Sequence, residues 1–364
     1  MDDPLADTPT KGRGAVSNPA GRFEPERRHG VDDGWDFLDD LPPLRTEVTD
    51  EPCRTILTRN RSPDIPFETS INPYKGCEHG CVYCYARPSH SYMGLSPGLD
   101  FETRLFAKPA AAALLDQELR KASYRPQVIA LGSNTDPYQP IERHRKITRS
   151  VLEVLSRFNN PVGIVTKSAL VLRDIDILAP MAEKGLASVA VSVTSLDNRL
   201  QRLMEPRASS PKRRLEAIRG LSAAGIPVTV MAAPMIPFLN DPELERILDV
   251  AAAAGARGAG YIHLRLPYEL KDLFSEWLEA HYPEKAKHVL SRIRQNRGGD
   301  LSSAHFGERM RGTGEHADLL AKRFRLACKR LGLNNARDEG EPELGLDTGQ
   351  FSIPLETGDQ LALF

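Results

Sequence analysis

Short apolar runs rich in β-branched residues alternate with amphipathic stretches through the middle of the 364-residue chain, and this alternation constrains the fold most strongly. The apolar runs predict strands at 127–132, 162–166, 187–193, 226–231 and 259–266. The intervening patterns predict helices at about 109–124, 142–158, 171–184, 211–224 and 241–255. Because strand and helix repeat in turn, the chain is predicted to be an α/β protein with a parallel sheet.

We expect this sheet to be barrel-like rather than doubly wound. No Gly-x-Gly-x-x-Gly fingerprint follows the first strand, and the polar signatures sit at the carboxyl ends of strands, where α/β barrels place their sites. The predicted fold is therefore a partial (β/α)6 TIM-like barrel. Beyond Pro267 the pattern is helical only, at about 268–282, 284–296 and 315–331, which predicts a C-terminal helical appendage.

The two ends of the chain differ in composition from this middle part. Residues 1–65 are rich in Pro, Gly, Asp and Arg and lack apolar periodicity, and Gly, Glu and Asp dominate residues 334–364. We expect an irregular N-terminal arm at 1–65 and a flexible tail at 334–364. The barrel is then expected at 66–267 and the helical appendage at 268–333.

Composition narrows the functional classes. Lys plus Arg (48) nearly cancel Asp plus Glu (49), so the bulk charge does not mark a general binder of nucleic acid or membranes. No run approaches the ~20 apolar residues that span a bilayer, and the acidic start lacks a signal-peptide core. The five cysteines are few and three are crowded together, which favours a metal site in a reducing compartment. We expect a cytoplasmic protein with no membrane partner.

The crowded cysteines are the main functional motif. Cys77, Cys81 and Cys84 are spaced C-x3-C-x2-C in the segment that starts at Ile71, directly after an expected first strand, so that the run 127–132 is the second strand. Gly76 and Gly80 permit the positive φ angles of a loop that bends tightly around a cluster. Iron-sulfur clusters commonly have four Cys ligands, so three leave one iron open for a cofactor or substrate. An open position indicates chemistry.

A zinc site is the alternative for these cysteines. A closed tetrahedral site needs a fourth ligand, for which the candidates are Cys53, His79 and His90. The protein would then be a zinc-stabilised nucleic-acid-binding module without catalysis. Cys328 lies in an amphipathic helical stretch and is expected to be a buried core thiol.

The cysteine spacing resembles the hallmark of the radical S-adenosylmethionine (SAM) superfamily, and the resemblance spans residues 66–267. Within it the chain is similar to the spore photoproduct lyase-like group and to uncharacterised bacterial proteins that share the arm Gly12-Arg-Gly-Ala15 and the run Ser62-Pro-Asp-Ile-Pro66. The resemblance implies a 4Fe-4S cluster on Cys77, Cys81 and Cys84 that binds SAM. It also implies reductive cleavage of SAM to a 5′-deoxyadenosyl radical, with electrons from a reductant such as flavodoxin or ferredoxin.

The resemblance also implies roles for polar residues at the strand ends. Binding of the SAM amino group is expected from the run after the second strand, Ser133, Asn134, Thr135 and Asp136. Lys167 is expected to pair with the SAM carboxylate, and the ribose is expected at Ser192 and Thr194. For all of these, turn formation, helix capping or simple exposure is the alternative.

Two tyrosines flank Cys84 as a pair does in spore photoproduct lyases, where the pair relays a hydrogen atom. The resemblance makes Tyr83 and Tyr85 the catalytic candidates and also places Tyr83 against adenine. The hydrogen-donating cysteine of those lyases has no counterpart here, because the matching neighbourhood reads Leu131-Gly-Ser-Asn134.

Basic clusters and the last residues bear on the substrate. Two arginine-rich clusters could follow a phosphate backbone, or form solvated helix faces: Arg199, Arg202, Arg207, Lys212, Arg213 and Arg214, and Arg292, Arg294, Arg297, Arg309 and Arg311. We favour DNA or RNA as substrate, for lesion repair or base modification, with a peptide or small molecule as the alternative. The end of the chain, Gln360, Leu361, Leu363 and Phe364, resembles a bacterial sliding-clamp-binding peptide, or folds back onto the barrel.

Overall fold

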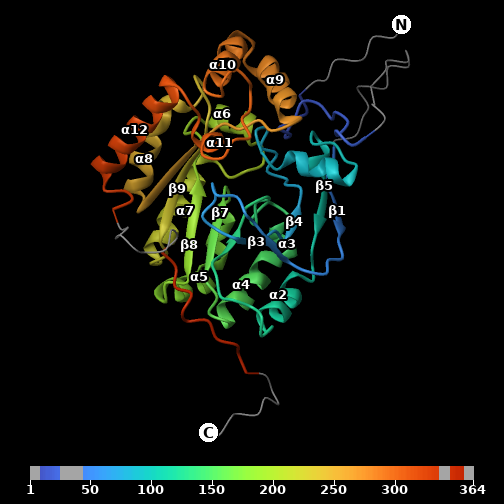
Figure 1. Cartoon of the computed structure of the whole chain (residues 1–364), viewed down its shortest axis with the longest axis vertical. Coiled ribbons are helices and arrows are strands. Elements are labelled where there is room, and N and C mark those ends of the chain that lie inside the picture. Colours follow the sequence, from blue (N-terminus) through green and yellow to red (C-terminus); the bar gives the residue numbers. More distant parts are fainter. Residues whose placement is uncertain (1–8, 25–43, 336–344, 356–364) are drawn as a thin grey trace.

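The computed structural model describes residues 9–24, 44–335 and 345–355. Within them, a seven-stranded sheet has the order β10-β9-β8-β7-β6-β3-β2 (Figure 1). Its parallel strands are β3 (Thr69–Ile71), β6 (Ile129–Leu131), β7 (Val162–Thr166), β8 (Ala187–Ser192), β9 (Val228–Met235) and β10 (Gly258–His263). The antiparallel edge strand is β2 (Leu57–Arg59). Each parallel strand is added beside the preceding one, so the α/β class and the open, partial-barrel order are confirmed.

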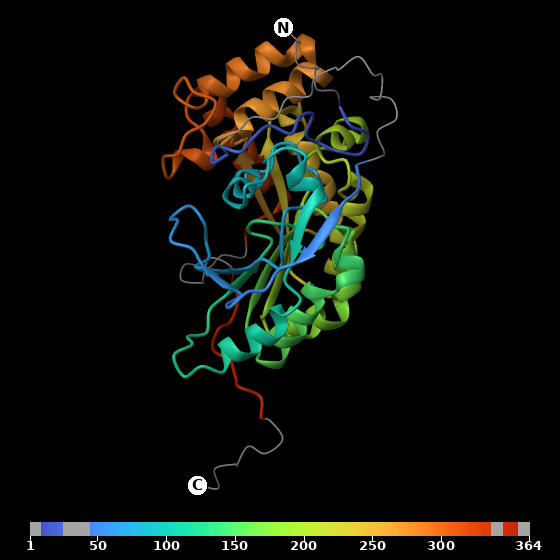
Figure 2. The ribbon, with the colours of Figure 1, turned by 90° about the vertical axis from the view of Figure 1, so that its right-hand side faces the viewer.

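Helices cover the outer face of this sheet, and in Figure 2 the green helices of this layer lie at the right, whereas the blue loop that precedes β3 projects to the left. Leu155, Leu178 and Leu248 from three of these helices are completely buried in the main core, as their apolar periodicity predicts. The helices of this layer are α2 (Ala111–Leu119), α3 (Glu142–Arg145), α4 (Ile147–Arg157), α5 (Ile175–Glu183), α7 (Pro211–Ala223) and α8 (Leu244–Ala253). None of the helices in the described ranges is long and apolar enough to cross a membrane.

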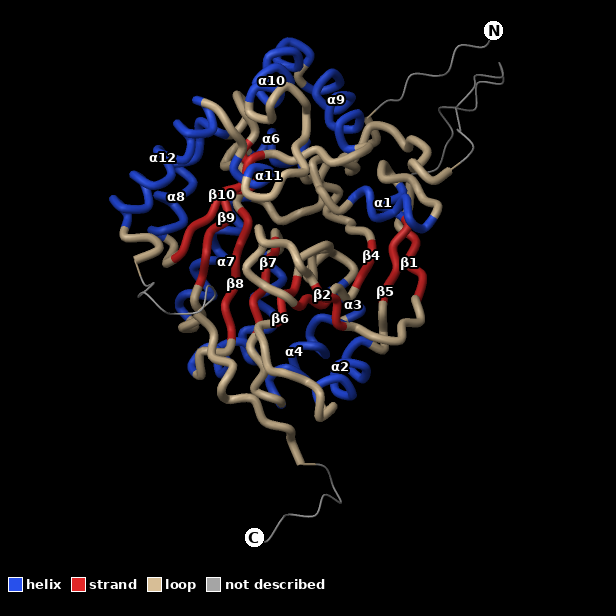
Figure 3. The backbone as a smooth tube through the Cα atoms, in the orientation of Figure 1, coloured by secondary structure: helices blue, strands red, loops and turns tan. Residues whose placement is uncertain are grey.

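A second, three-stranded sheet lies beside the main one (Figure 3). Its order is β1 (Glu47–Asp50), β5 (Arg104–Ala107) and β4 (Tyr74–Lys75). The strands β1 and β2 fall within the N-terminal region that we expected to be irregular. Both have three or four residues and mostly exposed side chains, so they carry no apolar pattern that sequence reasoning could recognise.

The C-terminal helices pack above the carboxyl ends of the strands. Trp277 and Phe274 of α9 are completely buried and belong to the same apolar cluster as Val82 of the cysteine loop. The Trp277 indole donates a hydrogen bond to the carbonyl oxygen of Leu203 at 3.1 Å. The C-terminal helices at this end are α9 (Leu270–His281), α10 (Pro283–Gln295) and α11 (Glu308–Arg311), and α6 (Asn198–Met204) lies with them, whereas α12 (Glu315–Leu331) packs against α8 and the main core. The part of the helical appendage formed by α9 thus packs on the cysteine loop.

The loop between β2 and β3, residues 60–68, connects the two edges of the open sheet. Asp64 accepts hydrogen bonds from the Gly307 backbone at 2.7 Å and from Arg309 Nε at 2.5 Å. Arg309 lies on α11, which packs beside β10 at the edge opposite β2. We call this contact the edge bridge. It joins the strand edges that a closed barrel would join by hydrogen bonding.

Residues 345–355, which we expected in a flexible tail, pack against the amino ends of the strands. The Phe351 ring centre lies 6.1 Å from that of Phe158 and 5.3 Å from that of Tyr124. The Ser352 backbone donates to the Phe158 carbonyl oxygen at 3.0 Å. The residues that resemble a sliding-clamp-binding peptide, Gln360 to Phe364, lie outside the described residues.

The Phe351 contact predicts a measurable contribution to stability. Phe351→Ala should lower the free energy of unfolding by about 2 kcal/mol, less than for a fully buried ring because Phe351 is half-buried. Denaturant unfolding and limited proteolysis at 345–355 measure the effect. Leu355→Ala is the control, because Leu355 is 68% exposed. Equal unfolding energies for the two variants would contradict the packing role.

Candidate metal and cofactor site

The three cysteines lie on a short loop between β4 and the 3-10 helix Arg87–Met93. The loop turns at Gly76 and Gly80, whose φ angles are 75° and 66°. A Cβ atom at Gly76 would lie 2.6 Å from Leu105 Cδ2, and one at Gly80 would lie 2.7 Å from Glu102 Oε2. Both positions therefore require glycine for conformation and for space.

The thiols of this loop are free, and they lie close enough for their charges to interact. Cys77 and Cys81 are buried and Cys84 is half-buried. Burial, the Asp136 carboxylate and the other two thiols raise the pKa of Cys77 well above its usual value. The described residues contain no group of three or more His, Cys, Asp or Glu side chains gathered to hold a metal ion. The chemistry of the three free thiols on this loop is that of iron-sulfur ligands, although the thiols are not drawn together at metal-binding spacing in this structure.

The candidate zinc ligands His79 and His90 are engaged elsewhere. His79 Nδ1 lies 3.3 Å from Asp136 Oδ2, and His90 Nε2 contacts the Arg104 carbonyl oxygen at 3.0 Å. Burial lowers the pKa of His90 to about 4. Cys53, the third candidate, is a free and half-buried thiol.

A completely buried ion pair fixes the path of the cysteine loop. Arg87 donates to the Glu102 carboxylate, and neither residue is exposed. Arg87 also donates to the carbonyl oxygens of Cys81 at 2.8 Å and of Gly80 at 3.2 Å. Glu102 lies on the short helix α1 (Asp100–Thr103). The pair therefore ties the loop backbone to α1.

The N-terminal arm also binds Glu102, and we call Glu102 with its partners Arg87, Gly14 and Ala15 the Glu102 clamp. The backbone amides of Gly14 and Ala15 donate to the Glu102 carboxylate at 3.0 and 2.9 Å. A Cβ atom at Gly14 would lie 1.7 Å from the Gly80 carbonyl oxygen, so the backbone of the N-terminal arm is in direct contact with the backbone of the cysteine loop. Our sequence reasoning connected Gly12-Arg-Gly-Ala15 with a resemblance but missed its contact with the cysteine loop.

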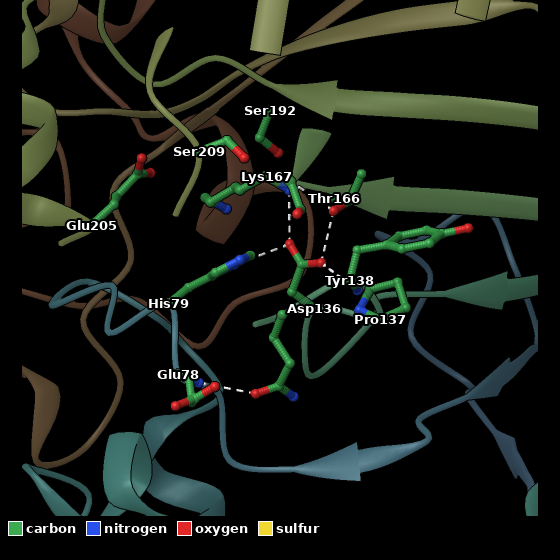
Figure 4. Close-up of polar contacts among 12 residues, drawn as sticks. Glu78, His79, Asp136, Pro137, Tyr138, Thr166, Lys167, Ser192, Glu205 and Ser209 are labelled. Atoms are coloured by element: carbon green, nitrogen blue, oxygen red, sulfur yellow. Dashed lines mark hydrogen bonds and ion pairs between the residues drawn. The ribbon is translucent and has the colours of Figure 1, made fainter. Parts of the chain in front are cut away.

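Asp136 gathers contacts from several segments (Figure 4). Its carboxylate accepts hydrogen bonds from Thr166 Oγ1 and from the Lys167 backbone amide, both at 2.7 Å, and from the Tyr138 amide at 2.9 Å. Burial favours its neutral form, but the charge of His79 and these donors together hold the pKa of Asp136 at about 2. The carboxylate is thus ionised and already surrounded by groups of its own chain.

The neighbouring residues of the same run use most of their polar groups internally. Asn72 Oδ1 accepts from the backbone amides of Asn134 and Thr135, at 3.0 and 3.4 Å, and Asn72 Nδ2 donates to Ser133 Oγ at 3.3 Å. Thr135 Oγ1 donates to the Tyr74 carbonyl oxygen at 3.0 Å. The Asn134 side chain makes no hydrogen bond within the described residues. Sequence reasoning missed Asn72, although it immediately follows β3.

Within the described residues, the Lys167 ammonium has no ion-pair partner and the Ser192 hydroxyl has no hydrogen-bond partner. Figure 4 draws both near Asp136, at the carboxyl ends of β7 and β8. Lys167 Nζ lies 5.8 Å from the centre of the Tyr83 ring and forms no ion pair with the described residues. The Ser192 carbonyl oxygen accepts from Arg214 at 3.1 Å, whereas its hydroxyl makes no hydrogen bond within the described chain.

Tyr83 and Thr194 meet at a buried carboxylate that sequence reasoning missed. Glu205 accepts hydrogen bonds from the Tyr83 hydroxyl and from Thr194 Oγ1, the latter at 2.7 Å. Arg214 donates to the same carboxylate, and both charged side chains are buried. Glu205 lies 122 residues beyond Tyr83, so no local pattern could have paired them.

Tyr85 points to a different strand end. Its hydroxyl donates to the Ser133 carbonyl oxygen, just after β6, and its side chain is 49% exposed. The guanidinium carbon of Arg265 lies 5.7 Å from the centre of its ring. Tyr83 and Tyr85 therefore flank Cys84 in sequence but contact opposite sides of the site.

Several members of the two basic clusters are paired with acids or carbonyl oxygens of the described chain. Arg207 pairs with Glu78 at 3.1 Å, Arg213 pairs with Glu216 at 2.8 Å, and Arg214 is buried against Glu205. In the second cluster, Arg297 donates to the Leu264 carbonyl oxygen at 2.6 Å and Arg309 pairs with Asp64. Residue spacing in the sequence does not show which arginines are neutralised by acids that are distant along the chain.

Comparisons with known proteins agree with this fold. The model of the radical SAM superfamily matches residues 71–251. An uncharacterized protein of Mycobacterium tuberculosis is 37% identical over 281 residues, which are 76% of this chain and 80% of that protein. One from Methanocaldococcus jannaschii is 28% identical over 214 residues, 59% of this chain and 76% of that protein.

Among solved structures, spore photoproduct lyase in complex with dinucleoside spore photoproduct is similar, with a TM-score of 0.55 and 18% identity. The alignment covers 79% of this chain and 80% of that chain. A variant of the same lyase with bound AdoMet and dinucleoside spore photoproduct also has a TM-score of 0.55, with 17% identity over the same shares. These likenesses concern the fold.

The Glu102 clamp leads to a prediction. Glu102→Gln leaves the buried Arg87 charge without its counter-charge, so the free energy of unfolding should fall by about 3 kcal/mol. Chemical denaturation measures this loss. Glu118→Gln, which removes the partner of the exposed Lys121, is the matched control and should cost under about 0.5 kcal/mol. A Glu102→Gln protein as stable as the control would refute the clamp.

Proposed function

This chain belongs to the radical SAM superfamily, and we propose that it is a radical SAM enzyme whose substrate is a nucleic acid, in lesion repair or base modification. The class of enzyme follows from the family match, and the family's cofactors are a 4Fe-4S cluster and SAM. When bound, these cofactors supply a 5′-deoxyadenosyl radical that abstracts a hydrogen atom from the substrate. The non-catalytic zinc module is set aside with this membership.

We propose that Cys77, Cys81 and Cys84 hold the cluster. Their support is chemical: three free thiols lie on one loop, and the Arg87 and Glu102 pair fixes its backbone. Arg87 and Glu102 then hold the loop backbone and leave the three thiols free to bind the cluster. The half-buried Cys84 directly precedes Tyr85, whose ring is half exposed.

For SAM, the unpartnered groups are the best candidates. Lys167 Nζ, which forms no ion pair with the described residues, is suited to a carboxylate, and the Asn134 amide, which makes no hydrogen bond with them, can accept from an ammonium. The Ser192 hydroxyl is available to a ribose. Ser133, Thr135 and Asp136 bind within the chain, and Thr194 is tied to Glu205. We propose that these four residues orient the site rather than contact SAM by their side chains.

The single observation that carries the nucleic-acid proposal is the position of Tyr85. Its half-exposed ring directly follows the third cysteine, and its hydroxyl is fixed on the Ser133 carbonyl oxygen. Such a ring can stack on a base, and a tyrosine pair at this place relays hydrogen in spore photoproduct lyases, which share the fold. The lyases' donor cysteine has no counterpart at Leu131-Gly-Ser-Asn134, so we propose a different final hydrogen donor.

A peptide or small molecule is the second candidate substrate. The observation in its favour is the internal pairing of Arg207, Arg214 and Arg309, which leaves less free positive charge than a long phosphate backbone would use. We further propose a cytoplasmic enzyme that takes electrons from flavodoxin or ferredoxin, because the thiols need reducing conditions to stay free.

The first prediction concerns the cluster. After anaerobic reconstitution and reduction with dithionite, the wild-type protein should form 5′-deoxyadenosine from SAM, whereas Cys84→Ala should lose both the brown colour and the nucleoside. Cys328→Ala is the control, because Cys328 lies on α12 and should leave both properties intact. A Cys84→Ala protein that still cleaves SAM would sink the cluster assignment.

The same assay separates the substrates. Irradiated or modified oligonucleotides should stimulate 5′-deoxyadenosine formation and change in mass during turnover. A peptide or metabolite pool that does so while the oligonucleotides do not would replace the nucleic-acid proposal with the second candidate.

The end of the chain gives an independent test of a link to DNA. We propose that Gln360, Leu361, Leu363 and Phe364 bind the bacterial sliding clamp, and the described chain before them ends at Leu355, near the amino ends of the strands. Deleting 360–364 should abolish clamp binding in a pull-down with purified clamp, while SAM cleavage continues at the wild-type rate. Undiminished clamp binding would refute this role.

A further inference from the structure

Arg265 is a cation at the site that the described chain leaves uncompensated. It follows β10 and is half-buried. Its polar contact with the described residues is a hydrogen bond to the thioether of Met310, Nη1 to Sδ at 3.5 Å, and its guanidinium lies 5.7 Å from the Tyr85 ring centre. No carboxylate among the described residues forms an ion pair with it.

The surrounding charges do not neutralise this arginine. Asp64, the nearby acid, is taken by Arg309 Nε at 2.5 Å and by the Gly307 amide. Burial and then the Arg309 charge lower the pKa of Arg265, so the folded chain holds this cation at a cost. Because a thioether is a weak acceptor, most of the five donor hydrogens of Arg265 have no partner of comparable strength. An anion placed here would satisfy them.

The location fits a substrate rather than a structural anion. Tyr85 holds one side of the position, next to Cys84 and against the Ser133 carbonyl oxygen. Met310 of α11 and the edge bridge hold the other side, between the two edges of the open sheet. An anion bound by Arg265 would therefore lie beside the cysteine loop, at the side where the sheet is open.

We propose that Arg265 and Tyr85 form a binding position for a phosphate-bearing nucleotide unit, with the guanidinium on the phosphate and the Tyr85 ring against the base. Arginine binds phosphate through paired donors, and an exposed aromatic ring stacks on a base of any sequence. The inference rests on the proposed nucleic-acid function and specifies which residues read the substrate. A free nucleotide would present the same chemistry, so the test includes both sources.

The test is a binding measurement on the reconstituted full-length protein. The probes are a fluorescein-labelled single-stranded oligothymidylate, its methylphosphonate analogue without backbone charge, and thymidine 5′-monophosphate as competitor. Arg265→Gln should weaken binding of the charged oligonucleotide by about tenfold, the loss expected for one charge-assisted hydrogen bond, and leave the analogue unchanged. Arg265→Lys, which keeps the charge without the planar fork, should lie between.

Arg330→Gln is the matched control, because Arg330 is an exposed arginine on α12, outside both basic clusters, that pairs with Asp249 at 2.6 Å. It should bind every probe as the wild type does. Iron content and the unfolding midpoint of each variant report folding, and Arg265→Lys serves as the informative variant if Arg265→Gln does not fold.

The outcomes separate the two proposals. Turnover of a nucleic acid by the wild type, combined with equal binding by Arg265→Gln, would overturn this inference and leave the proposed function standing. Equal weakening for the uncharged analogue would overturn the phosphate contact. Weakening confined to thymidine monophosphate would support the phosphate position but assign it to a free nucleotide. A wild-type protein that binds none of the probes would overturn both proposals.

Discussion

The buried Glu102 carboxylate is the group on which the cysteine loop depends. A buried charge is tolerated only with a counter-charge and hydrogen bonds, and here Arg87, Gly14 and Ala15 supply them. Because Arg87 uses further donors on the carbonyl oxygens of Gly80 and Cys81, the ion pair also sets where the thiols lie. The position of the three cysteines is thus determined by segments on both sides of them in the sequence.

Sequence patterns predicted those elements whose own residues determine their burial. The strand at 162–166 and the helix at 315–331 have the predicted bounds, because one is buried on alternate positions and the other has an apolar stripe. The strands Glu47–Asp50 and Leu57–Arg59 are short, mostly exposed and held by pairing with distant strands. Their hydrogen bonds leave no signature in the side chains, so the sequence could not predict them.

The same distinction separates the predicted site residues from the missed ones. Spacing alone suggested Cys77, Cys81 and Cys84 as candidate ligands, since a loop motif is local. Glu205 and Glu102 bind partners 122 and 88 residues away, at Tyr83 and Gly14, and only the fold brings them together. For arginines, sequence reasoning expected too much exposure rather than too few contacts. It grouped Arg214 with a basic cluster because its buried partner, Glu205, is not apparent from the sequence.

The charge that the site presents depends on which of its polar groups already have a partner within the chain. Asp136 is ionised but accepts from Thr166, Tyr138 and the Lys167 amide, so its charge serves to join strand ends. Glu205 is likewise compensated by Arg214. Among the described residues, the charged groups near the cysteine loop that lack an ion-pair partner are Lys167 and Arg265, and partial burial strengthens their attraction for an anion. Because the nearby acids Asp136 and Glu205 are already compensated, these two cations are the basis of our proposal that the site takes anionic partners, one beside Tyr83 and one beside Tyr85.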